Sequence, residues 1–351
     1  MQRSRKLKRP FKESLPAWER GLKRLTRYAS IDIGTNTLRL LIASVDAQGA
    51  VRHEVYKRKI TRLGGDYAED TGIAPASAGR TFDALVEFSR TIADCGVEAV
   101  YAFATSVVRR ARNRDWFVGE VEKRTGIKIA VISGDEEARL ALTGVMSVID
   151  TRQGRDLVID IGGGSTEFIF TDKGRLTGAW SMEMGVVHLT EAHLFSDPPD
   201  RAQIGALEAA VTAVISRLKE RAEAGGIDVA AFSAEQGAVF VGTAGTITTL
   251  AALELNLEVY DRDMINGTRL SKAAIEQMYG HLLSLTLSER GRILSLEKGR
   301  EDLIIPGAAI TLKTMEAFGF DEILVSDAGL LEGIIIDRCR RGAVAQKTME
   351  G

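Results

Sequence analysis

Cysteine and proline are both scarce in this sequence. The 351 residues include only 2 Cys and 6 Pro. Cys95 and Cys339 are far apart, so they form neither a disulfide framework nor a paired metal or redox motif. The shortage of proline excludes a proline-rich linker protein, while 35 Gly residues suit an α/β protein with tight turns. A chain of this size with two cysteines is typical of the cytoplasm, and we expect that localisation.

Membrane segments, histidine metal motifs and common nucleotide-binding loops are also missing. No apolar run is long enough to cross a bilayer, and residues 1–28 lack the apolar stretch of a secretory signal. The four His residues lack metal-ligand spacing. Neither G-x-x-x-x-G-K-[ST] nor a G-x-G-x-x-G that opens a helix after a strand is present. The sequence therefore predicts no membrane partner, and it disfavours a P-loop enzyme and a dinucleotide-binding fold.

Charge is distributed unevenly along the chain. The net charge is −2, but the first 28 residues hold ten Lys or Arg against two Glu, so they carry +8 and the remainder carries −10. We interpret residues 1–27 as a basic N-terminal extension. Either it is a solvated terminus, or its cations attract polyanions such as polyphosphate. We expect no specific nucleic-acid partner.

A duplication spans most of the chain. Asp32-Ile-Gly34 and Asp160-Ile-Gly162 each end a short apolar strand, and they are 128 residues apart. Each is followed by two more predicted strands (38–45 and 51–60; 168–171 and 175–182), an amphipathic helix (77–93; 200–224) and a buried strand (99–105; 239–246). The pattern predicts an α/β fold of two duplicated domains, 28–150 and 151–329, with mixed sheets and a cleft between them. We expect residues 330–351 to pack back onto the first domain.

The two Asp-Ile-Gly turns suit phosphate. Glycine lets the backbone approach a ligand closely, and successive N–H groups form anion-binding nests. The candidate phosphate-binding residues here are Gly34, Thr35, Asn36, Thr37, Gly162, Gly163, Gly164 and Ser165. Asp32 and Asp160 can hold Mg²⁺ directly or through water. A plain glycine hairpin is the alternative, but the same turn occurring twice favours phosphate.

A third glycine turn and three charged residues complete the candidate site. The turn contains Gly242, Thr243 and Gly245, which either contact further phosphate or only join a strand to a helix. Arg109 is a candidate bidentate phosphate donor. Glu137 can orient a water, although helix capping explains its acidic neighbours and spacing alone does not select it from them. Glu167 either holds a metal-bound water or is an exposed strand residue.

These motifs together resemble the exopolyphosphatase and guanosine pentaphosphate phosphatase family (Ppx/GppA). The resemblance rests on the Asp-Ile-Gly-Thr-Asn-Thr turn, Thr105-x-x-x-Arg109, Ser133-Gly-Asp-Glu-Glu137-Ala-Arg-Leu, Asp160-Ile-Gly-Gly-Gly-Ser-Thr-Glu167 and Val325-Ser-Asp-Ala-Gly-Leu-Leu-Glu-Gly333. It implies two ribonuclease-H-like domains of the acetate kinase, sugar kinase, heat-shock ATPase and actin superfamily. It also implies Glu137 as the catalytic base, Arg109 on phosphate, and Asp160 and Glu167 near the metal and the attacking water.

The resemblance further implies a metal-dependent hydrolase that removes terminal phosphate from inorganic polyphosphate or guanosine pentaphosphate, with Mg²⁺ as cofactor and a homodimer as the expected assembly. It does not choose between the two substrates. Many relatives carry further helical domains, which leaves the grip on long polyphosphate open. Two alternatives remain: another kinase or ATPase of the superfamily, and a sensor that binds polyphosphate or a guanosine alarmone without turnover.

Overall fold

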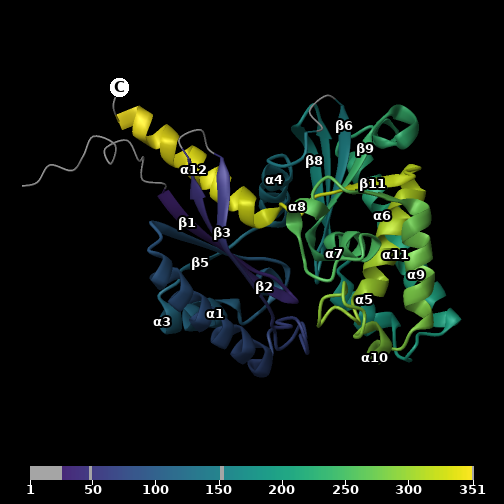
Figure 1. Ribbon diagram of the computed structural model, residues 1–351, viewed down its shortest axis with the longest axis horizontal. Helices are drawn as coiled ribbons and strands as arrows, with labels where there is room; N and C mark the ends of the chain where they lie inside the picture. The colour runs from purple at the N-terminus through teal and green to yellow at the C-terminus, as the bar shows by residue number, and fades with distance from the viewer. Residues whose placement is uncertain (1–25, 47–49, 151–153, 350–351) are drawn as a thin grey trace, which may run out of the picture.

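Two mixed β-sheets organise the protein. The computed structural model describes residues 26–46, 50–150 and 154–349. The predicted basic extension lies outside these residues except for Thr26 and Arg27, which belong to the first strand. The predicted turn at 46–49 also lies largely outside them. Figure 1 shows the sheets side by side, each with helices packed on it.

The first half of the chain builds a five-stranded sheet. Its elements are β1 (Thr26–Ile33), β2 (Thr37–Val45), β3 (Val51–Ile60), α1 (Pro75–Cys95), β4 (Ala99–Ala104), α2 (Ser106–Arg110), α3 (Arg114–Thr125), β5 (Ile129–Val131) and α4 (Gly134–Val145). The strand order is β3-β2-β1-β4-β5. The end of β1 is buried on both faces, as its central place requires, whereas edge strand β3 alternates between exposed and partly buried residues.

The second half builds a six-stranded sheet. Its elements are β6 (Arg155–Ile161), β7 (Thr166–Asp172), β8 (Arg175–Met182), α5 (Val186–His193), α6 (Arg201–Ala224), two short 3₁₀ turns (229–232 and 234–236), β9 (Val239–Thr243), α7 (Ala244–Glu254), α8 (Arg262–Ile265), β10 (Arg269–Ser271), α9 (Lys272–Ser284), α10 (Leu287–Arg290), α11 (Ile304–Phe318), β11 (Glu322–Val325) and α12 (Leu330–Met349). The strand order is β10-β11-β9-β6-β7-β8.

The two sheets share one topology, which confirms the predicted α/β fold of duplicated ribonuclease-H-like domains. In each sheet three consecutive strands pair antiparallel, and the first of them also pairs parallel with the strand that follows a helix. A second parallel strand then extends each sheet, and β10 adds an antiparallel edge to the second. One expected boundary is wrong: the strand predicted over 239–246 ends at Thr243, where helix α7 begins.

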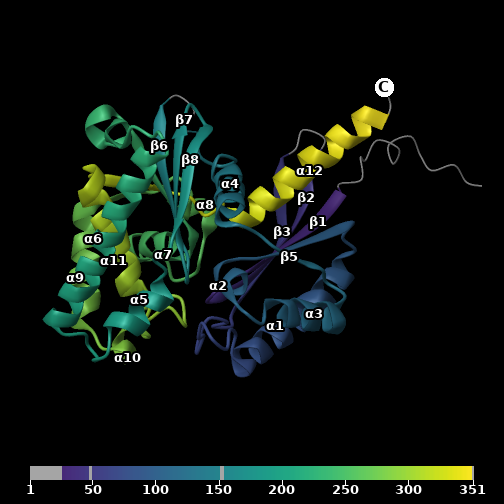
Figure 2. The ribbon, with the colours of Figure 1, turned by 180° about the vertical axis from the view of Figure 1, so that it is seen from behind.

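Helices α4 and α12 lie between the two sheets (Figures 1 and 2). Although α4 follows the first sheet in sequence, its Ala138 and Ala141 pack on β6, β7 and β9 of the second. In return, Leu331 and Ile335 of α12 pack on Leu41 of β2 in the first sheet. The chain therefore crosses between the halves twice, and the two crossing helices also pack against each other. None of the helices in the described ranges is long and apolar enough to span a membrane.

Candidate active site

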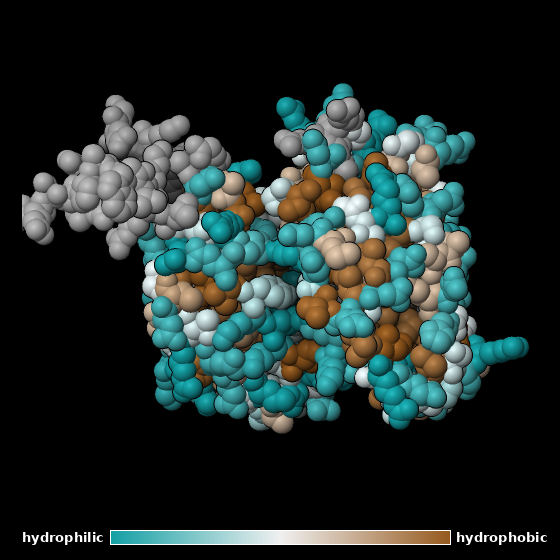
Figure 3. Space-filling view, in the orientation of Figure 1, coloured by the Kyte–Doolittle hydropathy of each residue, from teal (hydrophilic) through white to brown (hydrophobic). Residues whose placement is uncertain are grey.

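A cavity of about 390 Å³ separates the two halves, and its lining comes from both sheets. On the face seen in Figure 3 the surface is hollowed between the halves. Most of the residues predicted from sequence line this cleft: Asp32, Gly34, Thr35, Asn36, Thr37, Glu137, Asp160, Gly162, Gly163, Gly164, Ser165, Glu167 and Gly245. The fold thus brings the two Asp-Ile-Gly turns and the two further carboxylates of Glu137 and Glu167 into one site.

The two Asp-Ile-Gly turns are alike down to individual atoms. The Gly34 amide donates to the Thr37 carbonyl at 3.0 Å, and the Gly162 amide donates to the Ser165 carbonyl at 2.9 Å. A side chain at either glycine would collide with the same carbonyl, since its Cβ would lie 3.0 Å from Thr37 and 2.9 Å from Ser165. The sequence repeat is therefore a repeat of one turn that requires glycine at its first position.

In both turns, backbone amides of neighbouring segments donate to the carbonyls. Some amides of the turns themselves have no backbone acceptor among the described residues. In the first turn the Asn36 carbonyl accepts the amides of Thr61 and Arg62, at 3.0 and 2.9 Å. In the second turn the carbonyls of Gly162 and Gly163 accept the first amides of α5, at 3.1 and 2.9 Å. Within the described ranges, the amides at the tips, those of residues 35, 36, 163 and 164, donate to no backbone carbonyl. Backbone N–H groups exposed in this way are anion-binding groups.

The turns also face each other at close range. A Cβ on Gly163 would lie 3.1 Å from the Asn36 nitrogen, and one on Gly164 would lie 2.5 Å from the hydroxyl oxygen of Thr35. Neither position has room for a side chain, which explains the run of three glycines in the second turn. An anion at this end of the cleft is therefore within reach of amides and hydroxyls from both halves of the protein.

The aspartates of the two turns differ, although their sequences match. Both guanidinium donors of Arg39 that face Asp32 contact its Oδ2, at 2.6 and 2.9 Å, so this carboxylate is neutralised by an ion pair. Asp160 has no ion pair or side-chain hydrogen bond among the described residues and is 8% exposed. Burial, partly opposed by Arg39 and increased by the charge of Asp32, raises the pKa of Asp160 to about 6. Asp160 is thus the freer carboxylate for a cation.

Glu137 and Glu167 lie buried at the closed end of the cleft, 8% and 1% exposed. The Ser133 hydroxyl caps α4, and one residue of helical rotation turns Glu137 inward while Glu136 pairs outward with Arg139 at 2.9 Å. Burial and the charge of Glu167 raise the pKa of Glu137 well above its usual value, against the pull of Arg109. Burial and Asp160 raise the pKa of Glu167 to about 7. The alternative of an exposed Glu167 is excluded.

Arg109 has a different place from the one predicted. Its guanidinium donates to Glu137 Oε2 at 3.0 Å and to the Ile132 carbonyl at 3.0 Å, and it does not line the cleft. Its nearest partner is therefore the carboxylate of Glu137 rather than a phosphate position in the cleft. Among its neighbours, Arg112 and Arg114 are exposed, whereas Arg110 is half-buried against His188 and Glu183.

The third glycine turn enters the site only in part. Gly242 and Thr243, predicted to contact phosphate, do not line the cleft, because Gly242 packs on core isoleucines and the Thr243 hydroxyl donates to the Ala328 carbonyl at 3.0 Å. Thr243 therefore does not cap α7, whose first residues, Ala244 to Thr246, face the cleft. Ala244 has φ 68, a strained conformation for alanine. The uncapped helix start offers amides to an anion.

Sequence reasoning missed the four arginines that line the cleft in the described part of the chain: Arg39, Arg58, Arg262 and Arg300. Arg39 and Arg58 are directly paired across β2 and β3, and the guanidinium of Arg300, from the loop before α11, lies against Gly245. Glu297 pairs with both Arg58 and Arg300. Burial, together with the charge of Arg300, lowers the pKa of Arg58 to about 10. The sequence offered one sign of these arginines, because Arg39 is the single charged residue in the otherwise mostly apolar strand Thr37–Val45.

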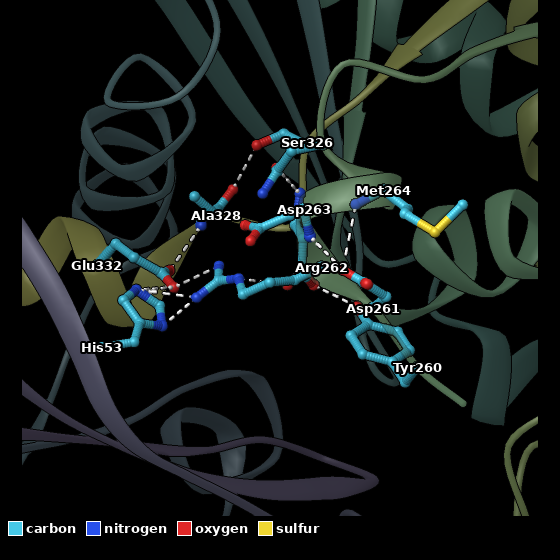
Figure 4. A network of polar contacts seen from close by, with 12 residues as sticks. His53, Tyr260, Asp261, Arg262, Asp263, Met264, Ser326, Ala328 and Glu332 are labelled. Carbon is cyan, nitrogen blue, oxygen red and sulfur yellow. Dashed lines mark hydrogen bonds and ion pairs between the residues drawn. The ribbon is translucent and has the colours of Figure 1, made fainter. Parts of the chain in front are cut away.

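A network of polar contacts joins the halves beside the arginines (Figure 4). The guanidinium of Arg262, from α8, reaches between His53 of β3 and Glu332 of α12, with 2.9 Å to His53 Nε2 and 3.1 Å to Glu332 Oε1. Arg262 also pairs with Asp327 at 3.0 Å, and Tyr260 donates its hydroxyl to the same carboxylate. All five side chains line the cleft, so the network fixes one wall of it across the interface.

The donors in the cleft fit a hard divalent cation. They are the carboxylates of Asp160, Glu137 and Glu167, together with Asp32 Oδ1, which is buried and has no hydrogen-bond partner among the described residues. Magnesium prefers oxygen ligands and usually takes one or two carboxylates, with water and substrate phosphate completing its shell. In the parts of the chain described, no three His, Cys, Asp or Glu side chains form a ready metal cluster, so such an ion would be shared with water and phosphate.

Comparison with known proteins gives a consistent result. The sequence model of the Ppx/GppA phosphatase family matches residues 41–341. The chain is 32% identical over 326 residues to exopolyphosphatase 2 of Mycobacterium tuberculosis, covering 89% of this chain and 98% of that protein. It is 26% identical to a guanosine-5'-triphosphate,3'-diphosphate pyrophosphatase of Aeromonas hydrophila, covering 88% and 58%. The crystal structure of the Aquifex aeolicus Ppx/GppA family member aligns with a TM-score of 0.74 at 30% identity, covering 91% and 99%.

Proposed function

Because the chain belongs to the Ppx/GppA phosphatase family, we propose that it hydrolyses the terminal phosphoanhydride bond of inorganic polyphosphate or guanosine pentaphosphate. One observation carries this proposal beyond family membership. Two matched turns that face each other carry amides with no backbone acceptor among the described residues. Two buried carboxylates, Glu137 and Glu167, line the same cleft, and Glu167 accepts a hydrogen bond from the Ser165 hydroxyl of the second turn at 2.8 Å. Anion donors beside a raised-pKa carboxylate are the parts that in-line attack of water on a phosphoryl group needs.

Each group then has a role in the proposed reaction. The amides of the two turns and the start of α7 hold the oxygens of the terminal phosphate. The arginines Arg39, Arg58 and Arg300 hold the rest of the anionic chain inside the cleft. Glu137 orients a water and takes its proton, and Glu167 fixes the same water or the metal. Arg109 positions the carboxylate of Glu137 while the water attacks.

Magnesium is the proposed cofactor, and Asp160 is its proposed main protein ligand. A bound Mg²⁺ would neutralise phosphate oxygens and draw negative charge away from the bond that breaks. The protein's own contribution is to supply Asp160 unpaired and to keep Glu137 and Glu167 away from bulk water. The ion pair with Arg39 makes Asp32 a structural anchor of the first turn with one oxygen, Oδ1, left over.

Phosphate release from polyphosphate, guanosine pentaphosphate and ATP, measured side by side with and without Mg²⁺, tests the proposal. We expect release from at least one of the first two substrates, only with the metal. Release from ATP alone would favour another ATPase of the superfamily. Tight binding of polyphosphate or guanosine pentaphosphate without release from any substrate would favour a sensor. The same assay chooses between polyphosphate and the nucleotide.

Stability should depend on pH and Mg²⁺ together. Because the pKa of Asp160 is raised to about 6 and that of Glu167 to about 7, the folded protein retains protons that the unfolded chain loses near pH 4. The free energy of unfolding of the metal-free protein therefore falls as pH rises from about 4, where the unfolded chain loses these protons, to about 7, where folded Glu167 loses its own. Magnesium competes with those protons, so it should raise the melting temperature more at about pH 8 than at about pH 5.5. Thermal unfolding at both pH values, with and without the ion, checks this; an equal effect at both would contradict it.

The two aspartates should respond differently to the same substitution. Asp160→Asn removes the freer carboxylate, so the Mg²⁺ concentration for half-maximal turnover should rise by about tenfold or more. Asp32→Asn removes the partner of Arg39, so it should lower the melting temperature while changing the Mg²⁺ requirement less. Magnesium titrations and melting curves of both variants give the comparison. If Asp32→Asn raised the Mg²⁺ requirement more than Asp160→Asn does, Asp32 rather than Asp160 would be the main metal ligand.

A further inference from the structure

A second cavity, of about 550 Å³, lies behind the two catalytic carboxylates. We call it the rear cavity. It is bounded by β8 and by the first turn of α4, and its lining includes Arg109, Arg110, Thr177, Ser181 and Arg221. Thr177 and Arg221 are exposed, so the rear cavity reaches solvent on a side of the molecule that the cleft does not use.

The rear cavity adjoins the cleft. Ser106 and Ser165 line both spaces. Glu137 faces the cleft, and its partner Arg109, 3.0 Å away, faces the rear cavity. Glu167 likewise faces the cleft, and the hydroxyl of Ser181 donates to it from the rear at 2.8 Å. Each catalytic carboxylate is therefore contacted from behind by a residue of the rear cavity.

The geometry of hydrolysis creates a need for such a space. The shortened substrate remains between the released phosphate and the arginines Arg39, Arg58 and Arg300 that line the cleft. Water attacks from the side opposite the bond that breaks, which is the side of Glu137. The released orthophosphate is then enclosed by the turns, the two carboxylates and the remaining chain. The rear cavity, which begins behind Arg109, offers a way out that does not require the chain to leave.

We propose that the rear cavity is the exit site for orthophosphate, with the ion pair between Arg109 and Glu137 as its gate. The inference rests on the proposed function. In the chemical step the water oxygen bonds to the terminal phosphorus, the bridging oxygen leaves with the shortened chain, and one water proton moves to Glu137. Arg109 lines the rear cavity and reaches the Glu137 carboxylate at 3.0 Å, so its guanidinium stands between the released anion and this cavity. By turning away from Glu137 it can pair with the orthophosphate and admit it to the rear cavity.

The cations of the rear cavity are suited to receive the anion. Nε of Arg110 is buried and has no partner among the described residues. The carboxylate that pairs with Arg110, Glu183, is 76% exposed at its side chain and 3.4 Å away, so water weakens that pair. Arg221 has no carboxylate partner in the described ranges, and its guanidinium contacts the sulfur of Met182 at 3.7 Å. The guanidinium groups of Arg109, Arg110 and Arg221 thus all line the rear cavity, which extends from the partner of Glu137 to solvent.

Charge reversal at the outer end of this path tests the proposal. Arg221→Glu places a negative charge at the opening, and Arg217→Glu, one helical turn earlier on the exposed face of α6, is the matched control that does not line the rear cavity. Bond cleavage is measured by quenching a single turnover of inorganic polyphosphate. Free orthophosphate is measured in the same mixture with a fluorescent phosphate sensor. Thr177→Trp, which fills the opening with a ring, is the second variant.

The ratio of the rate of orthophosphate release to the rate of bond cleavage should be the same in the unsubstituted protein and in Arg217→Glu. In Arg221→Glu and Thr177→Trp, cleavage should be unchanged while release slows by about tenfold, because local charge and access set the rate at which an anion passes. If Arg221→Glu and Thr177→Trp both release orthophosphate as fast as Arg217→Glu does, the proposal of a rear exit is overturned. Failure of the proposed function would look different, because the unsubstituted protein would then cleave neither polyphosphate nor guanosine pentaphosphate.

Discussion

Glu137→Gln is expected to lower the rate of phosphate release by about 10²- to 10⁴-fold, the usual contribution of a general base. Glutamine keeps the size of the side chain and an oxygen that can accept the hydrogen bond from Arg109. It cannot take a proton from water, and it removes the negative charge that burial and Glu167 destabilise. Substrate binding should therefore be retained or become tighter. Rates of phosphate release and equilibrium binding of polyphosphate to the same preparation give the two readouts.

Glu136→Gln provides the matched control on the same turn of α4. The Glu136 carboxylate faces outward and pairs with Arg139, so its loss removes a partly exposed ion pair and leaves the cleft intact. Phosphate release should stay close to that of the unsubstituted protein. Near-normal turnover in Glu137→Gln would remove Glu137 from its role, and equal losses in both variants would indicate damage to α4 rather than to the chemistry.

Gly333→Ala is expected to cause the largest loss of stability from a single methyl group. A Cβ at Gly333 of α12 would lie on the carbonyl oxygen of Leu140 in α4, and one at Gly144 would lie on the carbonyl of Gly329. Both obstacles are backbone atoms, so a rotamer change does not relieve them. Overpacking usually costs about 1–3 kcal/mol, and more where backbone must move. The midpoint of urea unfolding and the melting temperature should both fall.

Gly205→Ala distinguishes this packing effect from a general effect of replacing glycine in helices. Gly205 lies in α6, and no atom lies within 4 Å of the position that its Cβ would occupy. Alanine there should stabilise by about 0.4–1 kcal/mol, because it restricts the unfolded chain. The two substitutions therefore have opposite expected signs. Because α4 carries Glu137, Gly333→Ala should also lower turnover, and a Gly333→Ala protein as stable as the parent would show that the helices can move apart.

The fold was predictable to the extent that the sequence repeats itself. Two apolar strands with the same Asp-Ile-Gly ending, each followed by hairpins and a helix, predict two copies of one topology, and the structure confirms this. The boundary at 239–246 was predicted wrongly, because Gly242-Thr243-Ala244 continues an apolar run without a cap or proline to end it. What ends the strand is tertiary: the Thr243 hydroxyl bonds to the Ala328 carbonyl, and α7 starts at the next residue.

The parts of the candidate site that depend on residue type were predictable from the sequence. The parts that depend on which side chains contact each other were not. The turns had to contain glycine, and their tips do face each other across the cleft. The pairing of Asp32 with Arg39 depends on the register of β1 and β2, which places these two residues directly opposite. The position of Arg109 behind Glu137 depends on how α2 and α4 meet, and the sequence carries no trace of it.

The sequence by itself determined the α/β class, the duplication, the glycine requirement of the two turns and the family. Each of these follows from local patterns, since strand periodicity and glycine requirements are properties of short segments. The tertiary structure alone decided that Asp32 is paired while Asp160 has no ion pair among the described residues, and that Glu137 faces the cleft while Glu136 faces solvent. It also decided that a second cavity is lined by Arg109 and Ser181, which contact Glu137 and Glu167. These depend on contacts between segments far apart in the chain, which only the packing of the two halves can set.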